Sequence, residues 1–171
     1  MTIKRDNGKI MHLMLSDEMT EVLQANLPKI AFRLSALLPK ADFHHIGATA
    51  IPGALTKGDV DVVLRVDPAE FSIAVSALRS HFLVRQAENW TESFASFGDD
   101  LSYPFPLGVQ LVIKGSRDDI FLFLREYFIS EPAHVAEYNR IKAESVRSGP
   151  EEYWKAKNRY LSAILEAREN G

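Results

Sequence analysis

The sequence predicts an α+β fold in which a small mixed β-sheet is flanked by helices and followed by a helical C-terminal part. One observation is the run DVDVVLRV at 59–66, whose β-branched residues are typical of a strand. Another is a change in the spacing of apolar residues after Lys114. Before it they recur about every two residues, as in a strand, and after it about every 3.6 residues, as in a helix. The length of 171 residues suits a single domain at 1–171, with a mixed α/β layer at 1–115 and a helical part at 116–171.

The first two thirds of the chain alternate expected helices and strands. Apolar residues from 22 to 38 recur at helical spacing, and Pro28 should kink or split that helix. A second helix is expected up to residue 78, because Pro68 occupies the favoured first helical position after Asp67. Extended runs predict strands at 43–47, 59–66, 81–87, 90–97 and 108–114, with a loop at 48–58 and a turn at 98–100.

The last third is expected to be helical throughout. Apolar residues at helical spacing predict helices at 117–129, 132–148 and 150–168. Short breaks at 130–131 and 148–149 separate them. These three helices should pack on the mixed layer.

The composition excludes several classes of function. The chain has no cysteine, which excludes disulfides, thiolate catalysis, cysteine-ligated zinc and iron–sulfur clusters. The net charge is −3 and the sequence pI is about 6.0, so a nucleic-acid partner is not expected. No run reaches the roughly 18–20 apolar residues of a membrane helix, and the N-terminus lacks the pattern of a signal peptide. We therefore expect a cytoplasmic protein without a membrane partner.

Two aspartates mark a candidate metal site. Asp59 and Asp61 stand two positions apart on the expected strand, so both side chains point to the same face. Two nearby carboxylates repel each other unless a cation lies between them. Mg²⁺ suits such a pair, with Mn²⁺ as the alternative, because it binds one or two carboxylates and takes its other ligands from water and phosphate. The competing interpretation is that Asp59 only starts the strand and Asp61 faces solvent.

A glycine turn precedes the aspartates. Gly47 lets backbone N–H groups approach a phosphate without a Cβ in the way, Ala48 follows it, and Thr49 could add a hydroxyl. Alone, this glycine indicates no more than a tight turn. The order of the two motifs favours a nucleotide site, in which the turn holds the phosphates and the acids hold the metal.

The same residues resemble the signature of the GrpB family. The run HIGATAIPG at 45–53, then Lys57, then DVDV at 59–62 is similar to that family's H-I-G-S-T-[SA]-V-P-G-L, A-K-P and aspartate-pair strand. The helical part agrees in LREYF at 124–128, in Glu131-Pro132, Glu137-Tyr138 and Lys142, and in Tyr153 with Lys157. The resemblance covers residues 16–167.

This resemblance implies a nucleotidyltransferase-like fold of the polymerase-β type, with a third carboxylate on a neighbouring strand. The chain departs from the pattern in three places. Ala48 replaces a serine, Gly58 replaces a proline, and the strand expected at 108–114 carries Gln110 and no acid. Glutamine can orient a water or a hydroxyl but cannot accept a proton at neutral pH, so catalysis is more in question than nucleotide binding.

Three further side chains are candidates around this site. Lys57 could neutralise a phosphate, or it is an exposed loop lysine. Lys157 shares the apolar stripe of its helix, where it either reaches solvent or meets an acid or phosphate in a cleft. His45 is expected to support the Gly47 turn through a hydrogen bond.

The function that these residues predict is nucleotidyl transfer. Asp59 and Asp61 would bind Mg²⁺ and a nucleoside triphosphate or related phosphorylated small molecule, with the acceptor unspecified. The alternative is a nucleotide-binding or partner-stabilising accessory domain on the same fold, without catalysis.

Overall fold

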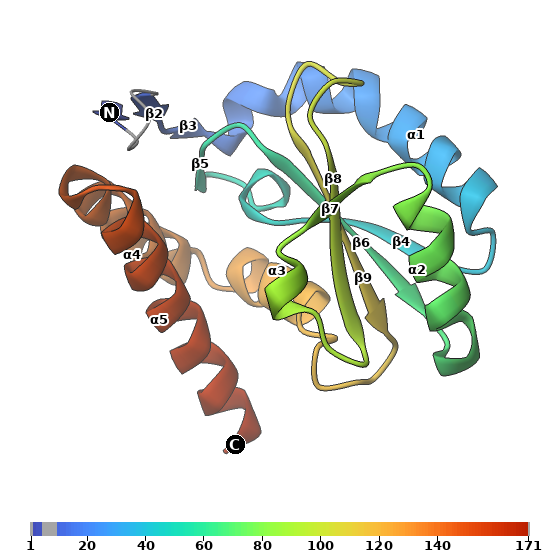
Figure 1. Cartoon of the computed structure of the whole chain (residues 1–171). Coiled ribbons are helices and arrows are strands. Elements are labelled where there is room, and N and C mark those ends of the chain that lie inside the picture. The colour runs from blue at the N-terminus through green and yellow to red at the C-terminus, as the bar shows by residue number, and fades with distance from the viewer. Residues whose placement is uncertain (1, 5–9, 171) are drawn as a thin grey trace.

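The structure, a computed structural model, describes residues 2–4 and 10–170. Its centre is a five-stranded mixed sheet (Figure 1). The parallel pair lies in the middle, and the remaining neighbours are antiparallel. In spatial order the strands are β4 (Asp42–Ile46), β6 (Val60–Val66), β9 (Leu107–Ile113), β8 (Phe94–Asp99) and β7 (Leu83–Arg85), with β6 parallel to β9. Two short ladders lie outside this sheet: β1 (Thr2–Lys4) with β2 (Ile10–His12), and β3 (Met14–Leu15) with β5 (Leu55–Thr56).

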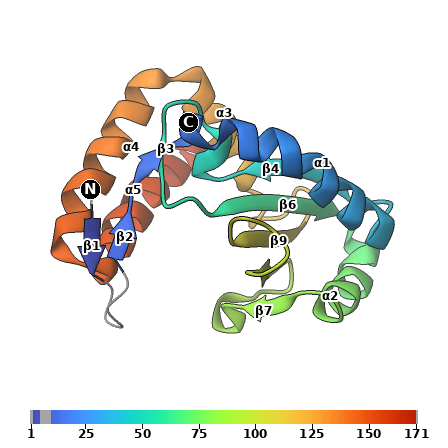
Figure 2. The ribbon, with the colours of Figure 1, turned by 90° about the horizontal axis from the view of Figure 1, so that it is seen from above.

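The helices cover the two faces of the sheet unequally (Figures 1 and 2). α1 (Thr20–Leu37) and α2 (Phe71–Arg79) pack on one face, and α3 (Phe121–Ser130) packs on the other. α4 (Pro132–Ser145) and α5 (Pro150–Glu169) form a pair beside the sheet. Short 3₁₀ turns connect these elements at Ser16–Met19, Ala48–Ala50, Pro68–Glu70, Ala87–Asn89 and Val146–Ser148.

Strand β6 shows why the sheet has two different faces. Val60, Val62 and Leu64 are buried in the main core with Ile30 of α1 and Leu78 of α2. Because side chains alternate along a strand, the intervening residues point to the opposite face. There Val63 packs with Ile46 and Val112 beneath α3, while Asp61 lies beyond the part that α3 covers. One face of the sheet is therefore sealed, and the other carries a charged group beside an apolar patch.

The C-terminal helices are joined to the loop that precedes β6. The side chain of Asn139 accepts a hydrogen bond from the Leu55 N–H at 2.7 Å and donates one to the Gly53 carbonyl at 2.8 Å. A second core forms nearby, where the Phe128 and Tyr138 rings stack with centroids 4.9 Å apart. These contacts hold α4, and with it α5, opposite the open part of the sheet.

The predicted α+β fold with a small mixed sheet is confirmed, and several element boundaries change. The strand expected at 81–87 is confined to Leu83–Arg85, because Gln86 has a positive φ of 44° and leads into a turn. The strand expected at 90–97 starts at Phe94 and continues to Asp99 through the predicted turn, since Gly98 still pairs with Gly108.

Helix α1 does not split at Pro28. A proline inside a helix removes one backbone hydrogen bond. The turns on either side nevertheless keep Leu23, Ile30 and Leu34 buried on the sheet, so the helix continues from Thr20 to Leu37. Among the described residues, no helix combines the length and apolar character needed to cross a bilayer.

The proline inside α1 yields a prediction on stability. We expect Pro28→Ala to raise the free energy of unfolding by about 1–3 kcal/mol, because an exposed interior position gains a hydrogen bond and a better helix former. Chemical denaturation would measure it. Lys29→Ala, at the exposed neighbouring position, should change stability by less than about 0.5 kcal/mol. A destabilised alanine variant would show that the proline ring itself packs favourably.

Candidate functional site

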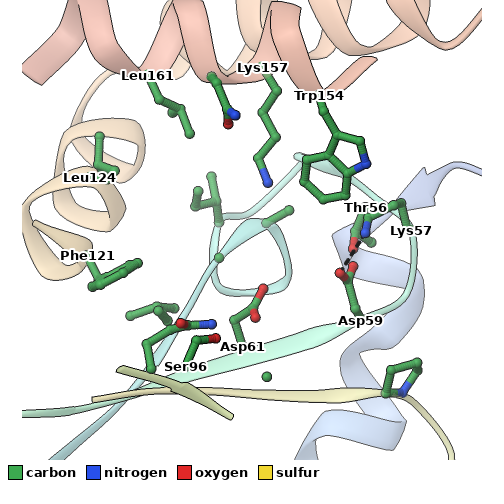
Figure 3. A pocket seen from close by; sticks show the side chains of 18 of the residues that line it. Thr56, Lys57, Asp59, Asp61, Ser96, Phe121, Leu124, Trp154, Lys157 and Leu161 are labelled. Carbon is green, nitrogen blue, oxygen red and sulfur yellow. Dashed lines mark ion pairs between the residues drawn. The ribbon is translucent and has the colours of Figure 1, made fainter. Parts of the chain in front are cut away.

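The predicted site residues meet in a cleft between the sheet and the C-terminal helices (Figure 3). Asp61 rises from the sheet floor, Asp59 lies on the loop entering β6, and Lys157 points down from α5 (Figure 3). The cleft volume is about 610 Å³, within the range of about 300–1,000 Å³ that is typical of small-molecule sites. The predicted residues that line it are Gly47, Ala48, Lys57, Asp59, Asp61, Gln110 and Lys157.

The Asp61 carboxylate fits between two glycines. Gly47 has a φ of +75°, and a Cβ there would lie 2.9 Å from Asp61 Oδ2. Gly108, which is directly paired with Asp61 across β6 and β9, would place a Cβ 2.2 Å from Oδ1. Any side chain at either position would displace the carboxylate. The requirement for Gly108 was missed in the sequence, where it marks only the start of a strand.

The expectation that both aspartates share one face is met, although β6 begins at Val60 and Asp59 precedes it. The two carboxyl groups differ in environment. Burial alone would raise the pKa of Asp59. The Lys57 ammonium has the larger net effect and holds the pKa of Asp59 below its usual value, because its Nζ lies 2.9 Å from Asp59 Oδ2. Burial and then the charge of Asp59 raise the pKa of Asp61 to about 6, against the pull of Lys157, Lys57 and a hydrogen bond from Gln110.

Trp154 lies between the two predicted lysines (Figure 3). The Lys57 and Lys157 ammonium groups are 4.6 and 4.8 Å from the centre of the Trp154 ring. Such cation–π contacts hold flexible ammonium groups without neutralising them. Trp154 was not among the sequence candidates, and the only signal was its place beside Tyr153 in the last helix.

Lys142 is a further cation of the cleft that was not predicted as a site residue. Its side chain is buried, its Nζ donates to the Leu55 carbonyl at 2.7 Å, and it lies 3.8 Å from the centre of the Tyr138 ring. No carboxylate of the described residues forms an ion pair with it. Burial and then the neighbouring charge of Lys157 lower the pKa of Lys142 to about 7. Burial likewise lowers the pKa of Lys157, although Asp61 opposes that shift.

The side chains of the Gly47–Thr49 turn point to different sides. Ala48 lines the cleft, whereas the Thr49 side chain faces away from it and lies 2.9 Å from His45 Nε2. The Thr49 hydroxyl thus lies beside His45 and does not line the cleft, so its expected role at a phosphate stays a prediction. Burial and then the charge of Arg125 lower the pKa of His45 to about 4, so the ring is a neutral support for the turn.

The residues present fit a Mg²⁺ ion. The described part of the chain has no group of three or more histidine, aspartate or glutamate side chains placed to hold a metal. Asp59 and Asp61 form a two-carboxylate set, which is what Mg²⁺ uses when phosphates and water complete its shell. The Lys57 ammonium pairs with the Asp59 carboxylate and so compensates one of the two negative charges. The chemistry and charge of this pair thus suit a hard divalent ion.

Lys142 allows a test of this electrostatic description. We expect Lys142→Met to stabilise the protein at pH 7 by about 1–3 kcal/mol, because it removes a buried ammonium without a carboxylate partner. Between pH 7 and about 10 the unfolded wild-type chain binds more protons than the folded one, so wild-type stability should rise with pH and approach the variant. Thermal unfolding across that range measures both.

The exposed Lys40 supplies the matched control, since Lys40→Met removes an ammonium that is paired with Glu70 at the surface. It should leave the melting temperature nearly unchanged. A Lys142→Met variant that melts below the wild type at pH 7 would contradict the burial penalty.

The chain also resembles known proteins in sequence and in fold. The sequence profile of the GrpB protein family matches residues 17–167. The UPF0157 protein VC_A0354 of Vibrio cholerae is 28% identical over 163 residues, which cover 92% of this chain and 84% of that protein.

Solved structures share the architecture at low sequence identity. GrpB from Enterococcus faecalis matches with a TM-score of 0.65 and 15% identity, over 90% of this chain and 99% of that one. The Cid1 poly(U) polymerase matches with a TM-score of 0.51 and 13% identity, over 75% of this chain but only 40% of Cid1. The fold is therefore nucleotidyltransferase-like. Because the family profile spans nearly the whole sequence, this chain belongs to the GrpB family.

Proposed function

We propose that the cleft binds a nucleoside triphosphate with Mg²⁺ and transfers its nucleotidyl group to an acceptor. The observation that carries the proposal is the meeting of Asp59 and Asp61 with lysines from three separate elements in one small-molecule-sized cleft. Paired acids suit a metal, and an excess of lysines suits the phosphates that the metal bridges. The fold likeness to Cid1, of which one solved structure has MgGTP bound and a TM-score of 0.50, is consistent with this use of the fold.

Each side chain has a distinct part in the proposal. Asp59 and Asp61 would hold Mg²⁺, which neutralises phosphate charge and favours attack at the α-phosphorus. Lys57 would release Asp59 to the metal and turn to a phosphate oxygen within reach of the same loop. Lys157, held against Trp154, would bind the outer phosphates.

One observation favours the alternative of a nucleotide-binding accessory domain. The neighbouring strand β9 offers Gly108 beside Asp61 and Gln110 two residue pairs further along, and neither can accept a proton. Gln110 lies on the same face of the sheet as Asp61 and lines the same cleft, which supports a role for it beside the acids. In an enzyme with this site, a phosphate oxygen or a water molecule would accept the acceptor's proton in place of a third carboxylate.

The aspartate pair gives the direct test of binding. We expect Asp59→Asn with Asp61→Asn to abolish Mg²⁺-dependent nucleotide binding while leaving the fold intact, because neutral amides are poor ligands for a hard cation. Calorimetric titration with and without Mg²⁺ would measure it. The matched control is Asp42→Asn with Asp67→Asn, two acids that contact Lys114 elsewhere on the sheet. Unchanged Mg²⁺-dependent affinity in the first double variant would refute the proposed site.

Pyrophosphate release separates the enzyme from the accessory domain. With Mg²⁺, each nucleoside triphosphate and a pool of small-molecule acceptors, we expect the wild type to release pyrophosphate above background and Asp61→Asn to lose that release. Coupled enzymatic detection of pyrophosphate measures the rate. Tight nucleotide binding with only background release would favour the accessory function.

A further inference from the structure

The cleft has two ends of different character (Figure 3). Lys57, Lys157 and Trp154 stand at one end, beside Asp59. At the other end the walls are apolar and come from helices that flank the sheet. These walls are Phe121 and Leu124 of α3 and Leu161 of α5.

The floor of the apolar end carries two polar side chains. Ser96 of β8 is directly paired with Gln110 of β9, so both project from the same face of the sheet as Asp61. Ser96 is 4% exposed as a residue and lines the cleft, and its hydroxyl forms no hydrogen bond with any residue that the structure describes. Its oxygen is not among the buried polar atoms that lack a partner, so it is accessible from the cleft. A hydroxyl retained there in a ligand-sized cleft is therefore available to a ligand.

Gln110 adds an acceptor beside this hydroxyl. Its amide nitrogen lies on the side of Gly108 and Asp61 and lowers the pKa of Asp61, and an amide also carries a carbonyl oxygen that accepts hydrogen bonds. The Ser96 hydroxyl both donates and accepts. Together they present hydrogen-bonding groups of both kinds on a part of the sheet two residue pairs from Asp61.

The surrounding rings favour a flat ligand. Phe94 lies next to Ser96 on the same face of β8 and stacks with Phe121 of α3, with ring centroids 6.1 Å apart and an interplanar angle of 27°. An apolar wall over a polar floor suits a planar ring whose edge carries donors and acceptors. It does not suit a phosphate, whose burial requires paired charge.

Arg85 and Arg125 are the cations that could contradict this division, because both line the cleft and Arg85 is directly paired with Ser96. The Arg85 guanidinium forms an ion pair with Asp100.

The Arg125 guanidinium is already engaged: Nη1 donates to the His45 carbonyl at 2.9 Å, and Nε and Nη2 donate to Glu126. The ammonium groups of the cleft that form no ion pair with a described residue thus belong to Lys142 and Lys157.

We propose that Ser96 and Gln110, under the wall formed by Phe121, Leu124 and Leu161, bind the heteroaromatic base of the nucleotide. The inference rests on the proposed function, in which the phosphates lie at the lysine end and the metal lies at Asp59 and Asp61. The nucleotide then spans the cleft, with its base on the sheet floor and its triphosphate toward α5. Ser96 and Gln110 become specificity-determining residues that read the edge of the base.

The test compares a ligand that has a base with one that lacks it. Wild type, Ser96→Ala and Leu161→Ala are titrated calorimetrically with the four Mg²⁺-nucleoside triphosphates and with Mg²⁺-tripolyphosphate. We expect each variant to weaken its best nucleotide about three- to tenfold, the loss of one hydrogen bond or one apolar contact. Tripolyphosphate affinity should stay unchanged. Ser76→Ala, on the exposed α2 surface and bonded to its own helix, is the matched control and should alter neither ligand.

Three other outcomes of these titrations would contradict either the base subsite or the proposed function. Equal wild-type affinity for tripolyphosphate and nucleotides would overturn the base subsite and leave the proposed metal–phosphate site standing. Variants that weaken both ligands equally, or neither, while their melting temperatures match the wild type, would also overturn it. Wild type that binds neither ligand with Mg²⁺ would overturn the proposed function and the subsite together.

Discussion

The burial of the Asp61 carboxylate between Gly47 and Gly108 is the constraint on which the rest of the site depends. The glycine turn and the two central strands must all approach closely, because a Cβ at either glycine would collide with a carboxylate oxygen. The parallel pairing of β6 with β9 sets Gly108 directly beside Asp61. The turn after β4 and the register of the sheet are therefore specified by the space that one side chain needs.

This buried charge also explains the distribution of cations. A carboxylate removed from water is stabilised only by nearby positive charge or hydrogen bonds. The cleft supplies Lys57 from the loop, Lys142 from α4 and Lys157 from α5, yet only Lys57 forms an ion pair with an acid of the site. Lys142 and Lys157 both have lowered pKa values because burial is not fully compensated. The uncompensated ammonium groups suit an anionic ligand.

The sequence was sufficient to predict what depends on local pattern. The central strand, the change to helical period after Lys114 and the face of the sheet on which Asp61 lies follow from alternation and spacing, whereas Asp59 lies on the loop before the strand. It could not predict features set by tertiary register. The need for Gly108 follows from pairing across strands, and the burial of Lys142 follows from the docking of α4 on Leu55. The side of the sheet on which the Thr49 hydroxyl lies is another such feature, because a hydroxyl after a glycine turn can face either side, and here it lies beside His45.

The C-terminal helices are as much a part of the site as the sheet. Asn139 and Lys142 of α4 form hydrogen bonds with the backbone of Leu55, in the loop before Asp59. α5 carries Lys157 and Trp154, which lie opposite the carboxylates. The spacing between sheet and α5 is thus set by contacts with the same loop that carries Lys57 and Asp59. The loop at residues 53–57 therefore joins the C-terminal helices to the charged end of the cleft, because Asn139 and Lys142 bond to its backbone and Lys57 pairs with Asp59.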